Sequence, residues 1–335
     1  MNAPVKHASV QDRSALKRER RRSLMLLAAI WLGFLVWPAI APNNYILALG
    51  SFFGIYLILI ASLNLLMGFA GQISLAHGAF FGLGAYTSGV LAVKADVSPW
   101  IGLPSAFLVC AVVATLVGVP ALRLKGHYLA MATLGLNAIM TVLFNELVFL
   151  TGGPNGLIGV PGFTLFGVSL ANETAFFYFA WTIAGLVMLA ILNLIQSRPG
   201  RALRSLAGNE IGAACLGINV TAYKVVVFAI SAGFAGVAGS LYVHKNNFAS
   251  PETFSFFISV LLVVMVALGG WGRYWGAFIG AAIYVAAPEV FRTLEDMELF
   301  MFGLIMILVM LFFPSGLVSL FERAGGALRR RERAR

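Results

Sequence analysis

The sequence predicts an all-α, polytopic membrane protein with about ten transmembrane helices. Of its 335 residues, 60% are hydrophobic and 11% are charged, whereas soluble domains carry about 25% charged residues. The mean hydropathy is +0.91. Residues 23–93 contain no Asp, Glu, Lys or Arg, and at about 1.5 Å of rise per residue they could cross a core of about 30 Å roughly three times. A β-barrel would instead show short alternating segments.

The chain contains ten apolar runs, each of which we expect to form a crossing. They lie at residues 24–41, 45–69, 73–93, 99–122, 127–150, 175–196, 224–243, 254–271, 275–291 and 298–314. The first run follows basic residues, as in a signal peptide, but it is longer than the usual apolar core of about 7–15 residues. We therefore expect it to be retained as the first crossing.

Lysine and arginine are distributed unequally between the two sides of the membrane. If the chain starts in the cytoplasm and the runs alternate, 20 of the 23 basic residues lie on the cytoplasmic side. Only Lys94, Lys245 and Arg292 then lie outside. The asymmetry predicts a transmembrane domain at 23–318 between two basic cytoplasmic tails, 1–22 and 319–335. The net charge of +10 thus reflects membrane topology and contact with anionic lipid, and not nucleic-acid binding.

Residues 62–86 combine polar side chains with glycines in a segment without charges. Gly68 and Gly71 predict a helix break, because glycine weakens a helix. Two interpretations of the polar groups stay open: hydrogen bonds between packed helices, or a helix end directed toward a polar translocation path. The candidates for the path in this segment are Asn64, Gln72, Ser74 and His77.

The run at 127–150 holds two further candidates for the path, Asn137 and Glu146, because polar and charged groups in membrane helices are costly and often functional. A secondary transporter or channel would need paired intramembrane acids, and the acids here are isolated. The segments "GAFFGLGAY" (78–86) and "GAFIGAAIY" (276–284) match at five of nine positions. The match indicates either two halves of a repeat or, as we favour, the limited residue set of tightly packed helices.

Two connections are long, an outer one at about 151–174 and an inner one at about 197–223. The inner connection mixes basic residues at its start with apolar ones, which predicts a short amphipathic helix outside the membrane. Such a helix could rest on lipid head groups or dock into a groove of a cytoplasmic partner, and the length of the connection favours docking.

Sequence motifs for catalysis are missing. There is no G-x-x-x-x-G-K-[ST] phosphate loop, no H-E-x-x-H and no evident Ser/His/Asp set. Cys110 and Cys215 lack the spacing of a metal site or a disulfide framework. We therefore expect no catalytic residues, no metal and no cofactor on this chain, so that any ATP would be hydrolysed by a separate chain.

Four motifs in order resemble the inner-membrane permease subunits of bacterial branched-chain amino acid ABC transporters, LivM type. They are "SLNLLMGFAGQISLAHGAFFGLGAY" (62–86), "TGGPNGLIGVP" (151–161), "GRALRSLAGNEIGAACLGINVTAYK" (200–224) and "GGWGRYWGAFIGAA" (269–282). The resemblance covers about residues 45–314. It implies an ABC importer permease fold in the bacterial inner membrane, a second related permease subunit, two cytoplasmic ATP-binding subunits, and a periplasmic binding protein that delivers leucine, isoleucine or valine.

The resemblance also places a loop that couples the permease to the ATP-binding subunits at residues 208–219. Glu210, Ala213, Ala214 and Gly217 match its pattern, with one extra residue after the glutamate and without the usual Leu-Pro that follows. Arg201 and Arg204 precede it in the same connection. Permeases for urea and short-chain amides are closely related, so these substrates remain an alternative to branched-chain amino acids.

Overall fold

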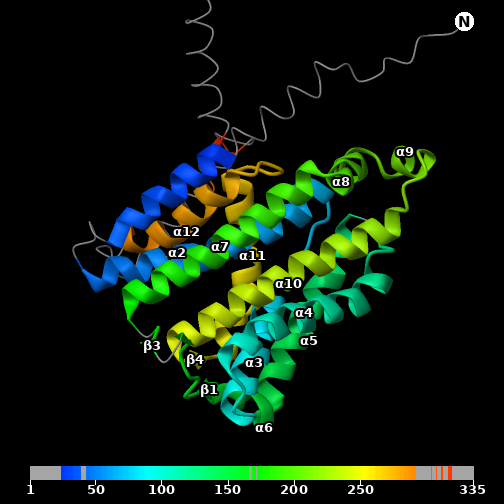
Figure 1. Cartoon of the computed structure of the whole chain (residues 1–335). Coiled ribbons are helices and arrows are strands. Elements are labelled where there is room, and N and C mark those ends of the chain that lie inside the picture. The colour runs from blue at the N-terminus through cyan, green and yellow to red at the C-terminus, as the bar shows by residue number, and fades with distance from the viewer. Residues whose placement is uncertain are drawn as a thin grey trace, which may run out of the picture.

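The computed structural model describes residues 24–38, 43–124, 126–165, 168–170 and 172–291, together with residues 303, 307, 311 and 316–318. Within these residues the fold is a bundle of helices with two pairs of short antiparallel strands and two 3₁₀ turns at its loops (Figure 1). The two predicted tails lie outside the described residues, as does nearly all of the tenth apolar run.

Every predicted run before residue 292 forms a helix. In chain order these are residues 24–38, α2 (Asn44–Asn64), α3 (His77–Lys94), α4 (Pro99–Ala121), α5 (His127–Glu146), α7 (Glu173–Gln196), α10 (Val220–Asn246), α11 (Phe256–Gly269) and α12 (Gly276–Phe291). Five described helices are long and apolar enough to cross a membrane, namely α2 with its extension to Phe69, α4, α5, α7 and α10. The chain is therefore a multi-pass α-helical membrane protein.

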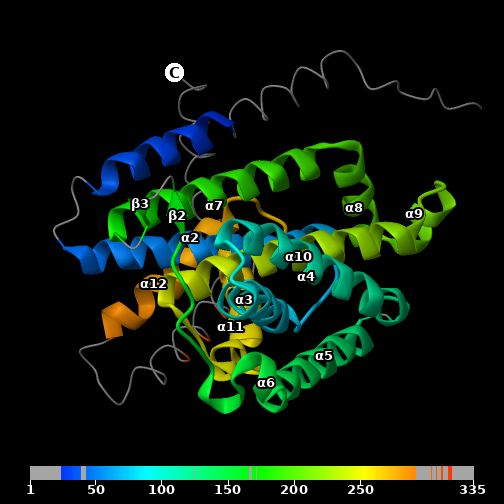
Figure 2. The same cartoon turned by 60° about the horizontal axis from the view of Figure 1, so that its bottom comes forward.

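Helix α10 packs against both α3 and α4, which also pack against each other (Figures 1 and 2). Glycines allow these helices to approach closely. A side chain at Gly84 of α3 would overlap the backbone of Gly236 in α10, and one at Gly239 would overlap the backbone of Phe81. Inside a membrane no hydrophobic effect drives helices together. Small residues instead let the helix backbones approach closely, so that packing contacts hold the helices together.

The direction of α10 relative to α3 agrees with alternating crossings. His77 lies beside Ser231, and Ser88, later in α3, lies beside Ser240, later in α10. The two helices are therefore parallel. Alternation requires this, because an even number of reversals separates the run at 73–93 from the run at 224–243. The total number of crossings and the side of each terminus stay predictions.

The helix at residues 24–38 packs against α7. The ring of Phe34 stacks on Trp181 with centroids 3.5 Å apart, and the indole N–H of Trp31 donates to the carbonyl of Trp181 at 3.0 Å. The Tyr178 hydroxyl donates to the carbonyl of Leu35 at 3.0 Å. Buried aromatic surface and these two hydrogen bonds make this helix part of the bundle.

The predicted outer connection folds at one end of α7 and α10. Its strand β1 (Leu157–Ile158) pairs antiparallel with β4 (Phe248–Ala249), and Glu173 forms an ion pair with Lys245. The remaining pieces of this region are α6 (Val148–Thr151), a 3₁₀ turn (Gly153–Asn155), β2 (Thr164–Leu165), β3 (Val168–Ser169) and a second 3₁₀ turn (Pro251–Phe254).

The inner connection lies at the opposite end and forms α8 (Arg198–Gly208) and α9 (Glu210–Cys215) (Figures 1 and 2). The amphipathic helix expected here is confirmed, but the predicted end of the connection at 223 is wrong, since α10 begins at Val220. The charge of Lys224 suggested a loop. Its side chain is instead 6% exposed and paired with Glu210, and Asn219 caps α10 by accepting a hydrogen bond from Ala222 N at 3.1 Å.

Candidate translocation site and coupling element

Helix α2 widens into a π-helical turn, Leu65–Phe69, and then stops. Gly71 has a φ of +67°, a conformation that residues with a side chain rarely adopt. The chain stays non-helical until α3 begins at His77. The predicted break is therefore confirmed. It places Gln72 and Ser74 in the irregular segment, with Asn64 and His77 on either side.

Side chains from α5 and α11 satisfy backbone groups that the break releases. Thr133 Oγ1 accepts a hydrogen bond from Leu75 N at 3.0 Å, and Asn137 Nδ2 donates to the carbonyl of Leu75 at 3.0 Å. Ser259 Oγ accepts from Gly78 N at 2.8 Å and from Asn137 Nδ2 at 2.6 Å. Buried backbone groups outside a helix require such partners, because an unpaired buried N–H or C=O is costly.

His77 bridges α3 to α2 and α10. Its Nε2 lies 3.3 Å from Ser62 Oγ and 3.2 Å from Ser231 Oγ. The Ser62 hydroxyl donates to the carbonyl of Leu59 at 2.8 Å, and the Ser231 hydroxyl donates to the carbonyl of Ser62 at 2.5 Å. Nε2 therefore lies within hydrogen-bond distance of both hydroxyl groups, whereas Nδ1 has no partner among the described residues.

The break also collects buried polar atoms without a partner among the described residues. Gln72 is 2% exposed, yet neither its Oε1 nor its Nε2 has a hydrogen bond. Asn137 Oδ1 and His77 Nδ1 are likewise buried and have no hydrogen-bond partner among the described residues. Ser74 is buried as well and accepts a hydrogen bond from Ala76 N at 3.4 Å. Each unsatisfied buried group costs about 1–3 kcal/mol, so a polar solute or a water molecule that paired with these atoms would be stabilised here.

A second helix break, residues 270–275 between α11 and α12, touches the first one. A side chain at Gly68 would overlap the backbone of Gly272. Asn64 Nδ2 donates to the carbonyl of Arg273 at 2.8 Å, and its Oδ1 accepts from Gly272 N at 3.1 Å. Asn64 therefore ties the two breaks together. The two nine-residue segments that match in the sequence, 78–86 and 276–284, lie at the starts of the helices that follow these breaks.

Glu146 is the one predicted path residue that lies apart from this cluster. It is exposed at the end of α5, nine residues beyond Asn137 and thus about 13 Å away along the helix axis. The sequence did not single out the hydroxyl groups that complete the cluster, which belong to Ser62, Thr133, Ser231 and Ser259. Serine and threonine occur in most membrane helices, and nothing in a single sequence shows which of them face a break.

We define the coupling element as residues 197–219, which contain α8 and α9. Asn209 caps α9 by accepting a hydrogen bond from Gly212 N at 3.0 Å. Glu210 stands in the first turn, where the helix dipole favours a negative charge, and forms an ion pair with Lys224 of α10. Gly217, two residues after the end of α9, has a φ of +79°.

The exposed surface of α9 is apolar. Ala213 is buried against the bundle, while Ala214 is exposed. Ile211 is 72% exposed and Leu216 is 78% exposed. In both views α9 extends beyond the other helices at the edge of the molecule (Figures 1 and 2). This small apolar projection is suited to insertion into a groove of another protein. Ile211 was not among the residues that the sequence indicated.

The two arginines of α8 in the predicted coupling set are exposed. Arg204 Nη2 donates to the carbonyl of Ile195 at 2.7 Å, which fastens α8 to the end of α7. Arg204 also borders a pocket of about 480 Å³ that is lined by Gly68 and Gly272 of the two breaks. The α8 helix, which carries Arg201 as well, therefore lies directly beside both helix breaks.

The sequence matches the family described as "Branched-chain amino acid transport system / permease component" over residues 45–311. The chain belongs to this permease family. Its members are transport components and not enzymes. The match covers all the described helices from α2 to α12, and with them both breaks and the coupling element.

Curated members of the permease family resemble the chain over most of its length. It is 32% identical over 323 residues to the high-affinity branched-chain amino acid transport system permease protein LivM of Salmonella typhimurium, covering 90% of this chain and 76% of the relative. LivM of Escherichia coli matches with the same identity and coverage. LivH of Salmonella typhimurium is 27% identical over 290 residues, covering 79% of this chain and 91% of the relative. No solved structure matches the chain.

Proposed function

We propose that this chain is one of two permease subunits of an ATP-driven importer that carries leucine, isoleucine and valine across the bacterial inner membrane. The observation that carries the proposal is the match to the permease family over residues 45–311. The named relatives include both LivM and LivH permease proteins, which supports a second, related permease subunit as partner. A periplasmic binding protein would deliver the substrate at the outer loops.

The translocation path runs, in this proposal, past the break between α2 and α3. The support is chemical. Gln72, His77 and Asn137 carry buried polar atoms without partners, which is where the charged ends of an amino acid would find hydrogen bonds. Asn64 and Ser74 shape the break. Glu146 stands at the predicted outer end of α5, where it would be met first by an entering solute.

Two cytoplasmic ATP-binding subunits would hold the coupling element and supply the energy, because this chain has no phosphate-binding loop in its sequence. The apolar projection of α9, formed by Ile211 and Leu216, supports this proposal. Movement of α8 would reach the breaks through the pocket that Arg204 shares with Gly68 and Gly272. ATP would be bound and used by the partner subunits, and this chain itself would bind no cofactor.

Reconstitution tests the proposal. The chain would be purified with a second permease subunit, ATP-binding subunits and a binding protein of the same transport system, and placed in liposomes. We expect ATP-dependent accumulation of leucine, isoleucine and valine, and none when this chain is omitted. Accumulation of urea or acetamide in place of these amino acids would overturn the substrate assignment. Uptake against a gradient by the chain alone would overturn the role as a passive subunit.

A further inference from the structure

A second histidine joins α3 and α10 near the ends of these helices that lie farther from the first helix break. His244 stands in the last turn of α10 and is 3% exposed. Its Nε2 lies 2.8 Å from Ser88 Oγ of α3, and the Ser240 hydroxyl donates to Ser88 Oγ at 2.8 Å. Both serines are fully buried. Neither the proposed path nor the coupling element includes these three residues.

The other ring nitrogen of His244 holds the outer connection. Its Nδ1 lies 2.6 Å from the carbonyl oxygen of Pro161. A carbonyl oxygen can only accept a hydrogen bond, so Nδ1 carries a proton and is the donor. In the neutral ring Nε2 then accepts from the Ser88 hydroxyl, which itself accepts from Ser240. One buried side chain thus ties the outer connection to both helices.

Further contacts fix the shape of the outer connection. Asn247 Nδ2 donates to the carbonyl of Val160 at 2.7 Å, and Val160 N donates to the carbonyl of Asn247 at 3.2 Å. The indole N–H of Trp100 in α4 donates to the carbonyl of Thr164 at 2.7 Å. Ile158, in the same segment, is 70% exposed. The outer connection therefore offers a preformed surface to a partner at this end of the molecule.

The backbones of α3 and α10 touch between the two histidines. A side chain at Gly84 of α3 would overlap the backbone of Gly236 in α10. His77, at the first break, contacts Ser231 of α10, and Ser88 follows on α3 after about 16 Å of helix. Closely packed interiors are hard to compress and transmit strain, so a displacement at one end of this helix pair reaches the other end.

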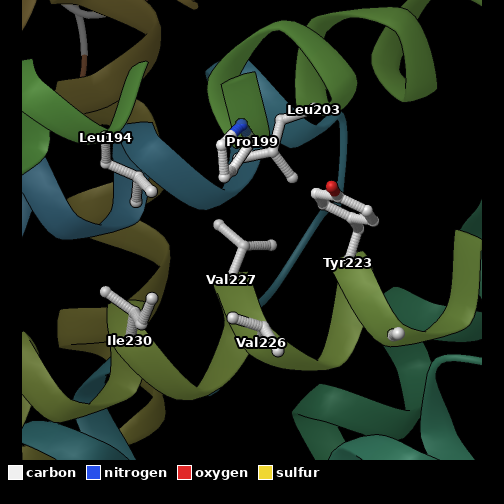
Figure 3. Close-up of a pocket in the computed structure, with 8 residues that line it drawn as sticks. Leu194, Pro199, Leu203, Tyr223, Val226, Val227 and Ile230 are labelled. Carbon is white, nitrogen blue, oxygen red and sulfur yellow. The ribbon is translucent and has the colours of Figure 1, made fainter. Parts of the chain in front are cut away.

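The contact of α10 with α8, at the opposite end of α10, is looser. Figure 3 shows Leu203 of α8 and Val227 of α10 on opposite sides of an apolar pocket of about 180 Å³. Pro199 and Tyr223 also line this space, and Val226 of its lining is 56% exposed. An open space between two helices lets one shift without moving the other. Helix α3 is therefore the stiffer route inward from the outer connection.

We propose that His244 is a positioning residue that transmits contacts made at the outer connection to the first helix break through α3. The inference rests on the proposed function, in which a binding protein meets the permease at its outer loops. Nδ1 holds the outer connection in the shape that the binding protein meets. Nε2 passes the displacement caused by docking to Ser88, and α3 carries it to His77 at the break.

Two substitutions separate the two nitrogens of His244. The side-chain amide of asparagine reaches the position of Nδ1, and that of glutamine reaches the position of Nε2. His244→Asn therefore keeps the tie to Pro161 and loses the one to Ser88, whereas His244→Gln does the reverse. Ser88→Ala breaks the link to α3 from the other side by removing one oxygen, so it should behave like His244→Asn.

ATP hydrolysis by the reconstituted importer is measured against the concentration of substrate-loaded binding protein. We expect His244→Gln to raise the half-saturating concentration by about three- to tenfold, the factor for one lost hydrogen bond, with an unchanged maximal rate. His244→Asn and Ser88→Ala should instead lower the maximal stimulation by about the same factor at an unchanged half-saturating concentration. Docking is then intact but no longer reaches α3. Hydrolysis without binding protein should keep its wild-type rate in all three variants.

Trp100→Phe is the matched control. It removes the hydrogen bond to Thr164 in the same connection, keeps an aromatic ring in place and leaves His244 untouched. It should raise the half-saturating concentration without lowering the maximal stimulation. A lower maximum in Trp100→Phe would show that any loosening of the outer connection has this effect, which would contradict the specific role of His244.

Hydrogen exchange on the purified full chain tests the tie without any partner. Exchange of residues 156–165 should rise by about three- to tenfold in His244→Gln and stay unchanged in His244→Asn. An unchanged rate in His244→Gln would overturn the tie to the outer connection. Wild-type maximal stimulation in His244→Asn and Ser88→Ala, or a change of both kinetic parameters alike, would overturn the transmission through α3.

Two checks keep these outcomes distinct. Coelution of all importer subunits on size exclusion verifies the fold of each variant, and Ser88→Ala decides the outcome if His244→Asn does not pass. If the binding protein stimulated no hydrolysis even in the wild-type importer, while the exchange pattern held, the proposed function and the transmission would both be overturned. The tie of His244 to the outer connection would stand.

Discussion

Asn64 and Gln72 lie on the same helix break, yet their side-chain amides have opposite surroundings. Both atoms of the Asn64 amide hydrogen-bond to the backbone of the second break, at Gly272 and Arg273. Neither atom of the Gln72 amide has a partner among the described residues. The two residues therefore separate a structural role from a role in the proposed path.

Replacing each amide by leucine should separate these roles. Asn64→Leu should destabilise the protein by about 0.6–2 kcal/mol, the range for hydrogen bonds between membrane helices, because it leaves two backbone groups of the second break unpaired. Gln72→Leu should leave stability unchanged or higher, since it removes an unsatisfied buried group, but it should reduce uptake at least tenfold. Thermal unfolding in detergent and uptake by the reconstituted importer measure the two effects. Normal uptake by Gln72→Leu would remove it from the path.

Residue types were easier to predict from the sequence than their contacts. The polar residues of 62–86 stand out because their neighbours are apolar and glycine predicts a break there. Their partners do not stand out. Ser259 lies 181 positions beyond Gly78, and only the packing of α11 against α3 brings them together. The sequence predicted a role in the path for Glu146 as well, because it is an isolated charge. Its position at the end of α5 places it away from the polar residues around the first break.

At the scale of elements, the coupling element shows how an ion pair can conceal a helix boundary. Its place and its amphipathic helix follow from the basic and apolar pattern of residues 198–218. The start of α10 does not follow from the sequence pattern, because a lysine in an apolar run indicates the end of a membrane span. Glu210 neutralises Lys224, so the helix can begin before it and bury the lysine.

A charge exchange tests this ion pair. Glu210→Lys puts two lysines in contact, and should lower the free energy of unfolding by about 1–3 kcal/mol, less than for a fully buried pair because the Glu210 side chain is 33% exposed. We expect it to abolish uptake and ATPase stimulation while membrane insertion persists. Adding Lys224→Glu should restore stability and part of the uptake. Wild-type uptake by Glu210→Lys alone would contradict the proposed role of this residue in coupling.

At the scale of the whole molecule, composition predicts the class of fold and the charge asymmetry predicts its orientation. The parallel packing of α3 and α10 agrees with alternation, but it does not show which side is cytoplasmic. What the sequence could not predict is the order of helices around α10. Small residues such as Gly236 and Gly239 make many close packings possible, and a single sequence does not choose among them.

The two cysteines provide a direct test of orientation. Cys215 is exposed on α9, whereas Cys110 is buried in α4. A membrane-impermeant maleimide should therefore label one site in inside-out vesicles and none in intact spheroplasts. Bound ATP-binding subunits should slow this labelling at least tenfold if they cover α9. A Cys215→Ser variant gives the background, and labelling in spheroplasts would show that the coupling element lies outside the cell.

The contact between the two helix breaks has a consequence for how the protein could change shape. Asn64 fastens one break to the other, and a side chain at Gly71 of the first break would press on Ala207 of α8. Both breaks and helix α8 thus meet at one place. In the transport cycle proposed above, a rotation that begins at α8 would therefore move both breaks together, as one lever and not as two independent gates.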